Sequence, residues 1–202
     1  PGSGDTATVN GGTVNITASV TVQTLILNGG TLQGSANLTV TQVMTWTEGT
    51  QSGSGATNIA SGATLNVNNT WVTLDARTLN NAGTVNWTAT NQWAFNNGAV
   101  LNNLAGATFN AQANGVTLGY YGNGVFNNQG TFVRSGPGTS YVAGPFYNSG
   151  TVQVTRGTLR PDNGGNSSGA FTANAGAILQ FNSNYTLNPG ATLTGAGLYQ
   201  LT

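Results

Sequence analysis

The side chains that could carry out acid–base or metal chemistry are few and scattered through these 202 residues. There is no His, Lys or Cys, so catalytic triads of the Ser-His-Asp or Cys-His kind are excluded. Zinc sites built on Cys or His are excluded for the same reason. The charged residues are four acids and four arginines: Asp5, Glu48, Asp75, Asp162, Arg77, Arg134, Arg156 and Arg160.

One enzymatic route stays open, the β-helix lyase or hydrolase that cleaves polysaccharides. A glycoside hydrolase needs two carboxylates across the scissile bond, and a calcium-assisted lyase needs a cluster of oxygen ligands. The densest charged group here is Arg156, Arg160 and Asp162, which we interpret as a surface ion pair beside a loop. Asp75 could still meet Asp162 in the fold, since each has an arginine nearby. We expect no catalytic site, metal or cofactor, and keep a polysaccharide-binding or polysaccharide-degrading β-helix of the lyase or tailspike kind as the alternative.

Aromatic rings offer a second kind of chemistry, because a flat ring can stack on the face of a sugar. Alternation with apolar neighbours predicts that Trp87 and Trp93 point inward. Another tryptophan lies between two threonines, and two tyrosines are adjacent, so that one ring of the pair must point outward in a strand. Trp71 and Tyr147 are further rings that could serve. The residues we predict to contact glycans are Trp46, Tyr120, Tyr121 and Tyr141.

The near absence of charge limits the partners. Only 4% of residues are charged, against roughly 25% in an ordinary soluble domain, and the net charge is zero. Without a basic patch, neither nucleic acid nor an anionic membrane surface is an expected partner. No run of 18 or more apolar residues occurs, so we expect no membrane insertion through a helix. The lack of cysteine suits a bacterial protein that is exported unfolded.

Two short phrases recur along the chain at a period of about 20 residues, which is typical of a solenoid. One is an apolar residue, an Asn and, shortly after, Gly-Thr followed by an apolar residue. The other is Gly-Ala-x-apolar. The first phrase is clearest at residues 79–85, 126–132 and 146–152, and the second at residues 62–67, 106–109, 176–181 and 190–193.

Alternation of apolar and polar residues fills the short segments between these phrases, as in Leu65-Asn66-Val67, and indicates strands with one buried face. Glycine before a strand can adopt a positive φ where the chain turns a corner. Asparagines in equivalent corners of stacked coils are predicted to form an amide ladder. The sequence therefore predicts an all-β, single-stranded right-handed parallel β-helix of about nine or ten coils. Residues 1–202 would form one β-solenoid domain, as a segment of a longer protein.

The phrases at 81–85, 128–132 and 148–152 resemble those of large bacterial surface proteins, the filamentous-haemagglutinin-like and autotransporter-passenger β-helices. The resemblance covers roughly residues 10 to 200 and is one of repeat style. It implies a stalk or adhesin module, extracellular or on the bacterial cell surface, that contacts glycans or the surface of a host or neighbouring cell. Such families have no shared catalytic residues to carry over.

Two other functions remain open. Unpaired strand edges at the ends of a solenoid could join copies end to end, or edge to edge, into a structural filament. Flat faces with Thr-x-Thr in every coil could order water or ice, but the pairs at 39–41, 45–47 and 88–90 do not recur at one coil spacing. Insertions at 119–124, 136–141 and 161–169 interrupt the repeat and are candidates for binding loops.

Overall fold

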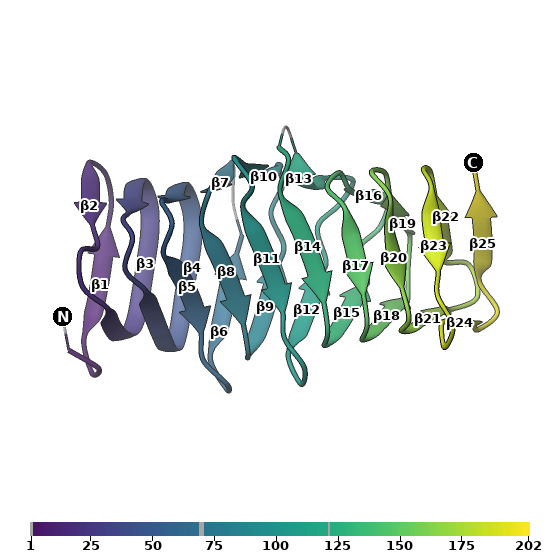
Figure 1. The fold of residues 1–202 in the computed structure, drawn as a ribbon, viewed down its shortest axis with the longest axis horizontal. Coiled ribbons are helices and arrows are strands. Elements are labelled where there is room, and N and C mark those ends of the chain that lie inside the picture. The colour runs from purple at the N-terminus through teal and green to yellow at the C-terminus, as the bar shows by residue number, and fades with distance from the viewer. Residues whose placement is uncertain (1, 69–70, 121) are drawn as a thin grey trace.

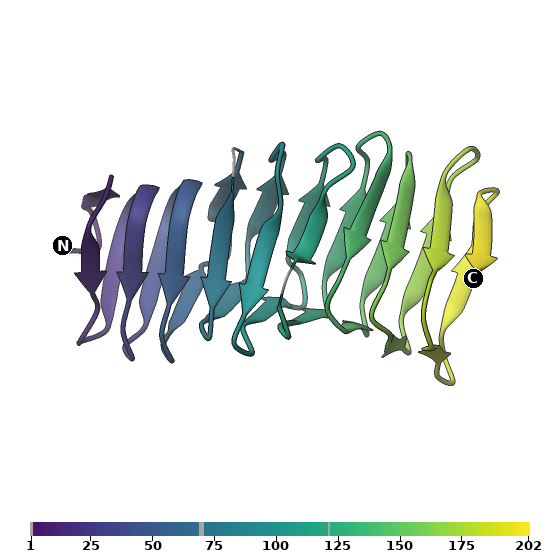
Figure 2. The same ribbon diagram turned by 90° about the horizontal axis from the view of Figure 1, so that it is seen from above.

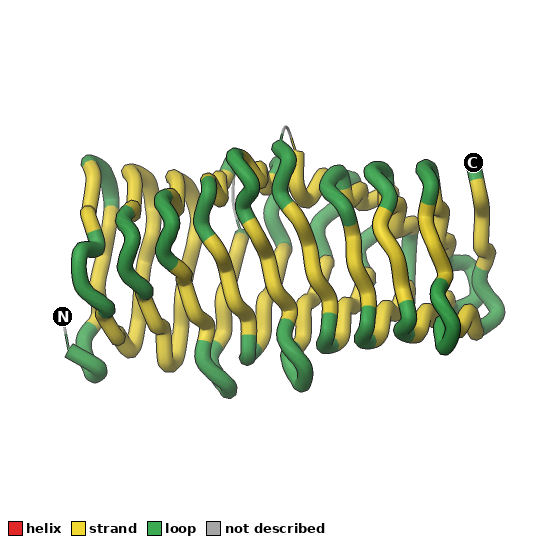
Figure 3. The backbone as a smooth tube through the Cα atoms, viewed as in Figure 1, coloured by secondary structure: helices red, strands yellow, loops and turns green. Residues whose placement is uncertain are grey.

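The molecule is a rod of stacked coils with its two termini at opposite ends (Figures 1 and 2). The structure is a computed structural model that describes residues 2–68, 71–120 and 122–202. Within these residues the chain forms strands, turns and loops and no helix (Figure 3). The strands stack in parallel over about ten turns of about 20 residues, which confirms the predicted β-solenoid.

Three parallel ladders run along the rod. The long strands β3 (Val20–Gln33) and β4 (Leu38–Ser52) pass through all three. Ladder 1 also contains β1 (Thr6–Val9), β6 (Thr64–Val67), β9 (Thr84–Trp87), β12 (Thr108–Ala111), β15 (Thr131–Arg134), β18 (Thr151–Val154), β21 (Ala170–Ala173) and β24 (Thr192–Thr194).

The other two ladders follow the same rule of one strand per coil. Ladder 2 also contains β2 (Thr13–Asn15), β7 (Val72–Asp75), β10 (Trp93–Asn96), β13 (Thr117–Tyr120), β16 (Thr139–Val142), β19 (Thr158–Pro161), β22 (Ile178–Phe181) and β25 (Leu198–Leu201). Ladder 3 also contains β5 (Ala56–Ile59), β8 (Thr78–Asn81), β11 (Val100–Asn103), β14 (Val125–Asn128), β17 (Phe146–Asn148), β20 (Gly165–Ser167) and β23 (Tyr185–Leu187).

The register stays constant although the coils differ in length. In ladder 1, Thr64, Thr84, Thr108, Thr131 and Thr151 are aligned partners in successive strands. Their numbering gives intervals of 20, 24, 23 and 20 residues (84−64, 108−84, 131−108, 151−131). The extra residues of these coils lie outside the ladder 1 strands, so the ladder 1 side chains that face the interior keep their places. The exceptions to the constant register are a shift of one residue at Gly119, between β10 and β13 in ladder 2, and shifts between β3 and β4.

The interior of the rod is filled by every second side chain of each strand. The ring of Phe109 lies 5.4 Å from that of Phe126 and 5.3 Å from that of Phe132, centroid to centroid. Trp87 and Trp93 are buried in the same core, as their alternation with apolar neighbours predicts. Burying one such aromatic side chain contributes roughly 2–3 kcal/mol, so the aromatic column is a main source of the stability of the rod.

A chain of buried amides, which we call the inner amide ladder, runs along one corner of the interior. It consists of Asn81, Asn103, Asn128, Asn148 and Ser167. Each Nδ2 donates to the side-chain oxygen of the next coil, at 2.8, 2.7, 2.8 and 3.0 Å in turn. The first three amides also donate, at 3.1 Å each, to a threonine carbonyl. The predicted asparagine ladder is therefore confirmed.

Two arginines are fully buried and bond to the backbone rather than to acids. Arg77 donates to four carbonyl oxygens and to the hydroxyl of Thr57, and Arg134 donates to five carbonyl oxygens, at 2.6–3.3 Å. Loss of hydration lowers the pKa of both guanidinium groups, that of Arg134 to about 10. The guanidinium group of Arg77 is therefore occupied by the carbonyl oxygens of neighbouring coils, although Asp75 is close to it in the sequence.

The two sequence phrases use glycine for different reasons. In Gly-Ala-x-apolar, Gly106 has a φ of +84°, as predicted for a corner. In the Asn-x-Gly-Thr phrase, Gly130 is not at positive φ, and a Cβ there would collide with the carbonyl oxygens of Leu104 and Ala107. The second kind of glycine therefore permits the close approach of stacked coils, which the sequence pattern alone did not indicate.

The inner amide ladder leads to a paired test on one strand. Asn103→Ala leaves buried groups of the neighbouring coils without partners, and we expect a loss of about 1–3 kcal/mol in the free energy of unfolding. The adjacent Asn102 is half-buried and faces outward, so Asn102→Ala should lose under about 1 kcal/mol. Urea denaturation of both variants measures the difference, and equal losses would contradict the role of the inner ladder.

Tyr185 gives a pH dependence. Its hydroxyl donates to the Asn166 carbonyl at 3.1 Å, and burial raises its pKa well above the ordinary value of 10.0. Above about pH 10 the unfolded chain loses this proton while the folded chain keeps it, so the stability falls as the pH rises. Tyr185→Phe should therefore show a smaller drop in Tm between about pH 9 and pH 11. The buried Arg134 acts oppositely but is common to both proteins, so parallel Tm curves would refute the assignment.

Candidate functional site

Trp46, predicted to be a surface ring, is fully buried. It lies on β4 in ladder 1, its Nε1 donates to the Gly49 carbonyl at 3.3 Å, and its ring meets the edge of Trp93 at 5.5 Å. The prediction is wrong because successive side chains of a strand point to opposite faces. The flanking threonines are the outward residues, so the tryptophan between them must face the core.

Two of the tyrosines predicted to contact glycans, Tyr120 and Tyr141, lie on neighbouring strands of ladder 2. Tyr120 is half-buried on β13 and packs edge to face with Trp71, with 5.7 Å between ring centroids. Trp71 itself is 38% exposed. Tyr121 lies outside the described residues. Tyr141, on β16, is half-buried, and its partner on β13 is Thr117.

The charged cluster near Tyr141 is an ion pair stacked on a ring. The Nε of Arg160 lies 2.6 Å from the Oδ1 of Asp162, and its Nη2 donates to Oδ2 at 3.1 Å. The guanidinium carbon lies 4.6 Å from the centroid of the Tyr141 ring. The hydrogen bond to Asp162 raises the pKa of Arg160. The predicted surface ion pair is confirmed, and it covers one face of the tyrosine that we expected to stack on a sugar.

The acids do not come together. Asp75 accepts a hydrogen bond of 2.6 Å from the Nδ2 of Asn97, at the side of a wide, shallow depression lined by Asn96, Asn97, Gly122 and Asn123. Among the described residues there is no group of three or more His, Cys, Asp or Glu side chains that could hold a metal ion. Asp75 and Asp162, whose meeting the sequence left open, belong to coils that are several strands apart in ladder 2.

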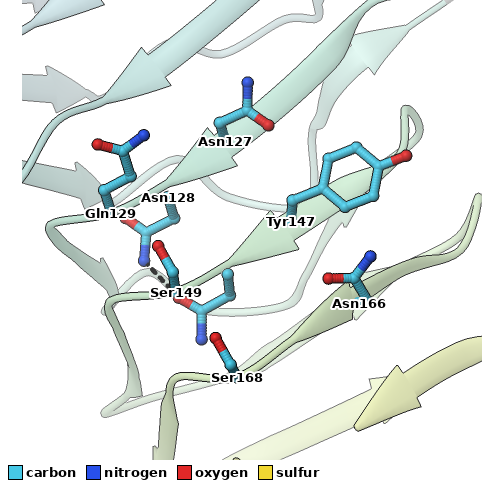
Figure 4. A pocket seen from close by; sticks show the side chains of 8 residues that line it. Asn127, Asn128, Gln129, Tyr147, Ser149, Asn166 and Ser168 are labelled. Atoms are coloured by element: carbon cyan, nitrogen blue, oxygen red, sulfur yellow. Dashed lines mark hydrogen bonds between the residues drawn. The ribbon is translucent and has the colours of Figure 1, made fainter. Parts of the chain in front are cut away.

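A polar cleft on the outer face of ladder 3 was not predicted (Figure 4). It has a volume of about 140 Å³ and extends over three successive coils. We call it the Tyr147 cleft. Its lining residues are Asn127, Asn128, Gln129, Tyr147, Asn148, Ser149, Asn166 and Ser168.

The floor and rim of the Tyr147 cleft come from the ladders already described. Two members of the inner amide ladder form its floor. Outward positions of β14, β17 and β20 supply Asn127, Tyr147 and Asn166, which are aligned partners in the register. In Figure 4 the tyrosine ring stands between the two asparagines. Tyr147 is 38% exposed, and no residue of the lining is charged.

A second chain of amides, the outer amide ladder, runs along the surface of ladder 3 and stops at this cleft. It consists of Asn58, Asn80, Asn102 and Asn127. The Nδ2 of each of the last three donates to the Oδ1 of the asparagine in the preceding coil, at 2.8–2.9 Å. Tyr147 occupies the next position in the register.

The signal for this cleft was present in the repeats. In the phrases at 79–85 and 126–132 the apolar residue is followed by Asn-Asn, whereas Phe146 is followed by Tyr147 and Asn148. An aromatic residue therefore replaces the outward asparagine of the repeat. Tyr147 is one of the rings available for stacking on a sugar, and its position in the phrase is what distinguishes it.

The Thr-x-Thr pairs considered for ice binding do not form one array. Thr39 faces outward in ladder 3, Thr45 faces outward in ladder 1, and residues 88–90 lie beyond the end of β9. The threonines that do align are single residues, one per coil, as from Thr64 to Thr151 in ladder 1 and from Thr13 to Thr73 in ladder 2.

No protein-family model matches the chain, and neither the curated proteins nor the solved structures contain a match to it. The fold and the site are therefore interpreted from the geometry alone. In the part of the chain that the structure describes, no helix has the length and apolar character needed to cross a membrane.

The burial of the tryptophans can be tested by fluorescence quenching. Trp46, Trp87 and Trp93 are each at most 1% exposed, whereas Trp71 is 38% exposed. We therefore expect acrylamide to quench a minor fraction of the emission, and Trp71→Phe to remove most of that fraction. Trp46→Phe should leave the quenchable fraction unchanged. A loss of quenching in Trp46→Phe would restore Trp46 as a surface residue.

Proposed function

We propose that this solenoid is a rigid, non-enzymatic module of a bacterial cell-surface or secreted protein, serving as a stalk or an adhesive surface. The observation that carries the proposal is the parallel stacking of three ladders along the whole rod. Continuous backbone hydrogen bonding and a filled core make such a rod stiff, because each coil is held by both of its neighbours. Amide and hydroxyl side chains on the outside supply solubility where charge is scarce.

The spacing of the acids supports a non-enzymatic role. Asp75 on β7 and Asp162 just after β19 are four strands apart in ladder 2, which is roughly 19 Å at about 4.8 Å per strand. Glycosidase carboxylates lie within about 9.5 Å of each other. Glu48 lies in the coil before that of Asp75. The residue aligned with Asp75 in that coil is Ser52, and Glu48 is four residues away from Ser52 along the chain.

The repeat phrases support the closer assignment to the filamentous-haemagglutinin-like and autotransporter-passenger class. A module of that class would lie outside the cell or on its surface. Its partners would be glycans or the surface of a host or neighbouring cell. The low charge and the lack of a basic patch favour uncharged partners over nucleic acid or membrane lipid.

A structural unit that joins end to end is the second candidate function, and the end faces of the rod favour it. At one end an apolar cavity of about 200 Å³ lies among side chains that include Val9, Val14 and Ile16. At the other end Leu198 and Leu201 are 50% and 85% exposed. Parallel strand edges with exposed apolar side chains can add a further coil.

The proposed function is tested by incubating the protein with a panel of soluble polysaccharides while released sugar and the length of the rod are measured. We expect no product and a particle size that matches one stiff rod. Product that is lost in Asp162→Asn but retained in Asp5→Asn would overturn the non-enzymatic role. Particles that lengthen with concentration, and shorten in Leu201→Asp, would favour the end-to-end filament instead.

A further inference from the structure

We propose that the Tyr147 cleft is a binding site for an uncharged glycan. The glycan lies along the rod axis and bridges the gap that Tyr147 makes in the outer amide ladder. This inference deepens the proposed function, on whose adhesive role it rests, by naming the surface and the ligand class. It starts from the hydrogen bonds that the outer amide ladder leaves unmade.

The outer amide ladder has a direction, because each of its three hydrogen bonds runs from an Nδ2 to the Oδ1 of the preceding coil. Asn127 uses its Nδ2 on Asn102, and its Oδ1 accepts no hydrogen bond from the described residues. Beyond the gap, the Oδ1 of Asn166 accepts from Asn188 at 3.3 Å, and its Nδ2 donates to none of them. Tyr147 therefore separates an unused acceptor from an unused donor.

A sugar hydroxyl can satisfy both groups, because it donates one hydrogen bond and accepts two. Neighbouring hydroxyls of a pyranose ring above Tyr147 could donate to the Asn127 oxygen and accept from the Asn166 amide. The exposed ring provides the apolar platform that the C–H face of a sugar needs. The hydroxyls of Ser149 and Ser168 and the amide of Gln129 add further polar groups along one side.

The direction and charge of the cleft restrict the ligand. One row of lining side chains is Asn127, Tyr147 and Asn166, and the other is Gln129, Ser149 and Ser168. Both rows repeat with the coils at about 4.8 Å. This spacing is close to the length of one sugar residue in a chain, so an extended glycan fits along the rod axis. The lining contains no arginine that could balance a uronate or sulfate group, and no acid that could bind an amino sugar cation. An uncharged polysaccharide is therefore favoured over an anionic one.

Hydrogen bonds within the protein hold side chains of the cleft in place before the ligand arrives. Asn127 is fixed by the outer amide ladder, and the floor is fixed by the hydrogen bond from Asn128 to Asn148 at 2.8 Å. Binding then orders few additional side chains, which lowers the entropic cost of association.

The decisive variant is Tyr147→Asn. The repeat predicts that an asparagine here would complete the outer amide ladder from Asn127 to Asn166, so the variant should fold with an equal or higher Tm. It should nevertheless lose glycan binding, because the ring is gone and the two unused groups are now occupied. Tyr147→Phe keeps the platform and should bind within about threefold of the wild type.

Two further variants separate the parts of the site. Asn166→Asp keeps the size and the acceptor for Asn188 but removes the unused donor, and we expect it to weaken binding about tenfold. Tyr141→Ala removes a half-buried tyrosine on ladder 2 that the sequence also predicted to contact glycans. Because the Arg160 guanidinium lies over that ring, we expect this variant to bind as the wild type does, which tests the Tyr147 cleft against the earlier prediction. All variants are measured by affinity electrophoresis with dextran, β-1,3-glucan, galactomannan and xyloglucan, and with alginate and polygalacturonate as charged probes.

Retention by one or more of the neutral polysaccharides that is lost in Tyr147→Asn and kept in Tyr141→Ala would support the site. Retention by the charged probes alone, or retention that Tyr147→Asn leaves unchanged, would overturn it while leaving an adhesive rod in place. A wild-type protein that none of the neutral probes retains would also overturn it and leave the stalk role. Release of sugar would instead contradict the proposed function itself.

Discussion

The structure depends on one constraint: no coil of this chain can satisfy its own buried polar groups. The amide of Asn103 takes its partners from the coil before and the two coils after it, and the guanidinium of Arg134 binds carbonyl oxygens of neighbouring coils. Unpaired, each of these groups would be costly to bury. Stacking is the arrangement that pairs the amide of Asn103 and the guanidinium of Arg134, and it also brings the aromatic residues into one continuous column.

Because the register is fixed, variation is confined to the turns and to outward side chains. Coils differ by up to four residues between Thr64 and Thr151, while the strands of ladder 1 keep their alignment. The same rule allows Tyr147 to replace an asparagine on the outer face without disturbing Phe146 and Asn148, which stay buried on either side of it. A binding surface can therefore be altered at little risk to the fold, which suits a protein of the proposed adhesive class.

The fold could be predicted from sequence because its signals are local and repeated. The alternation in segments such as Leu65-Asn66-Val67 and the spacing of the glycine phrases fix strands, turns and stacking. The site could not be predicted to the same extent. The exposure of Trp46 was assigned from its polar neighbours, although alternation makes such neighbours the sign of a buried residue. The Tyr147 cleft depends on which residues of different coils are aligned, and unequal coil lengths hide that alignment until the register is known.

The rod also has mechanical properties that follow from its termini. They lie at opposite ends of the rod, so a force between them acts along the direction in which the coils are stacked (Figure 1). Tension between the ends would therefore peel coils away singly rather than shear the whole rod. A coil of about 20 residues releases roughly 70 Å of chain, in place of about 4.8 Å of rod. A tether built in this way lengthens stepwise under load and dissipates energy at every step, while the coils that remain stacked keep their surface intact.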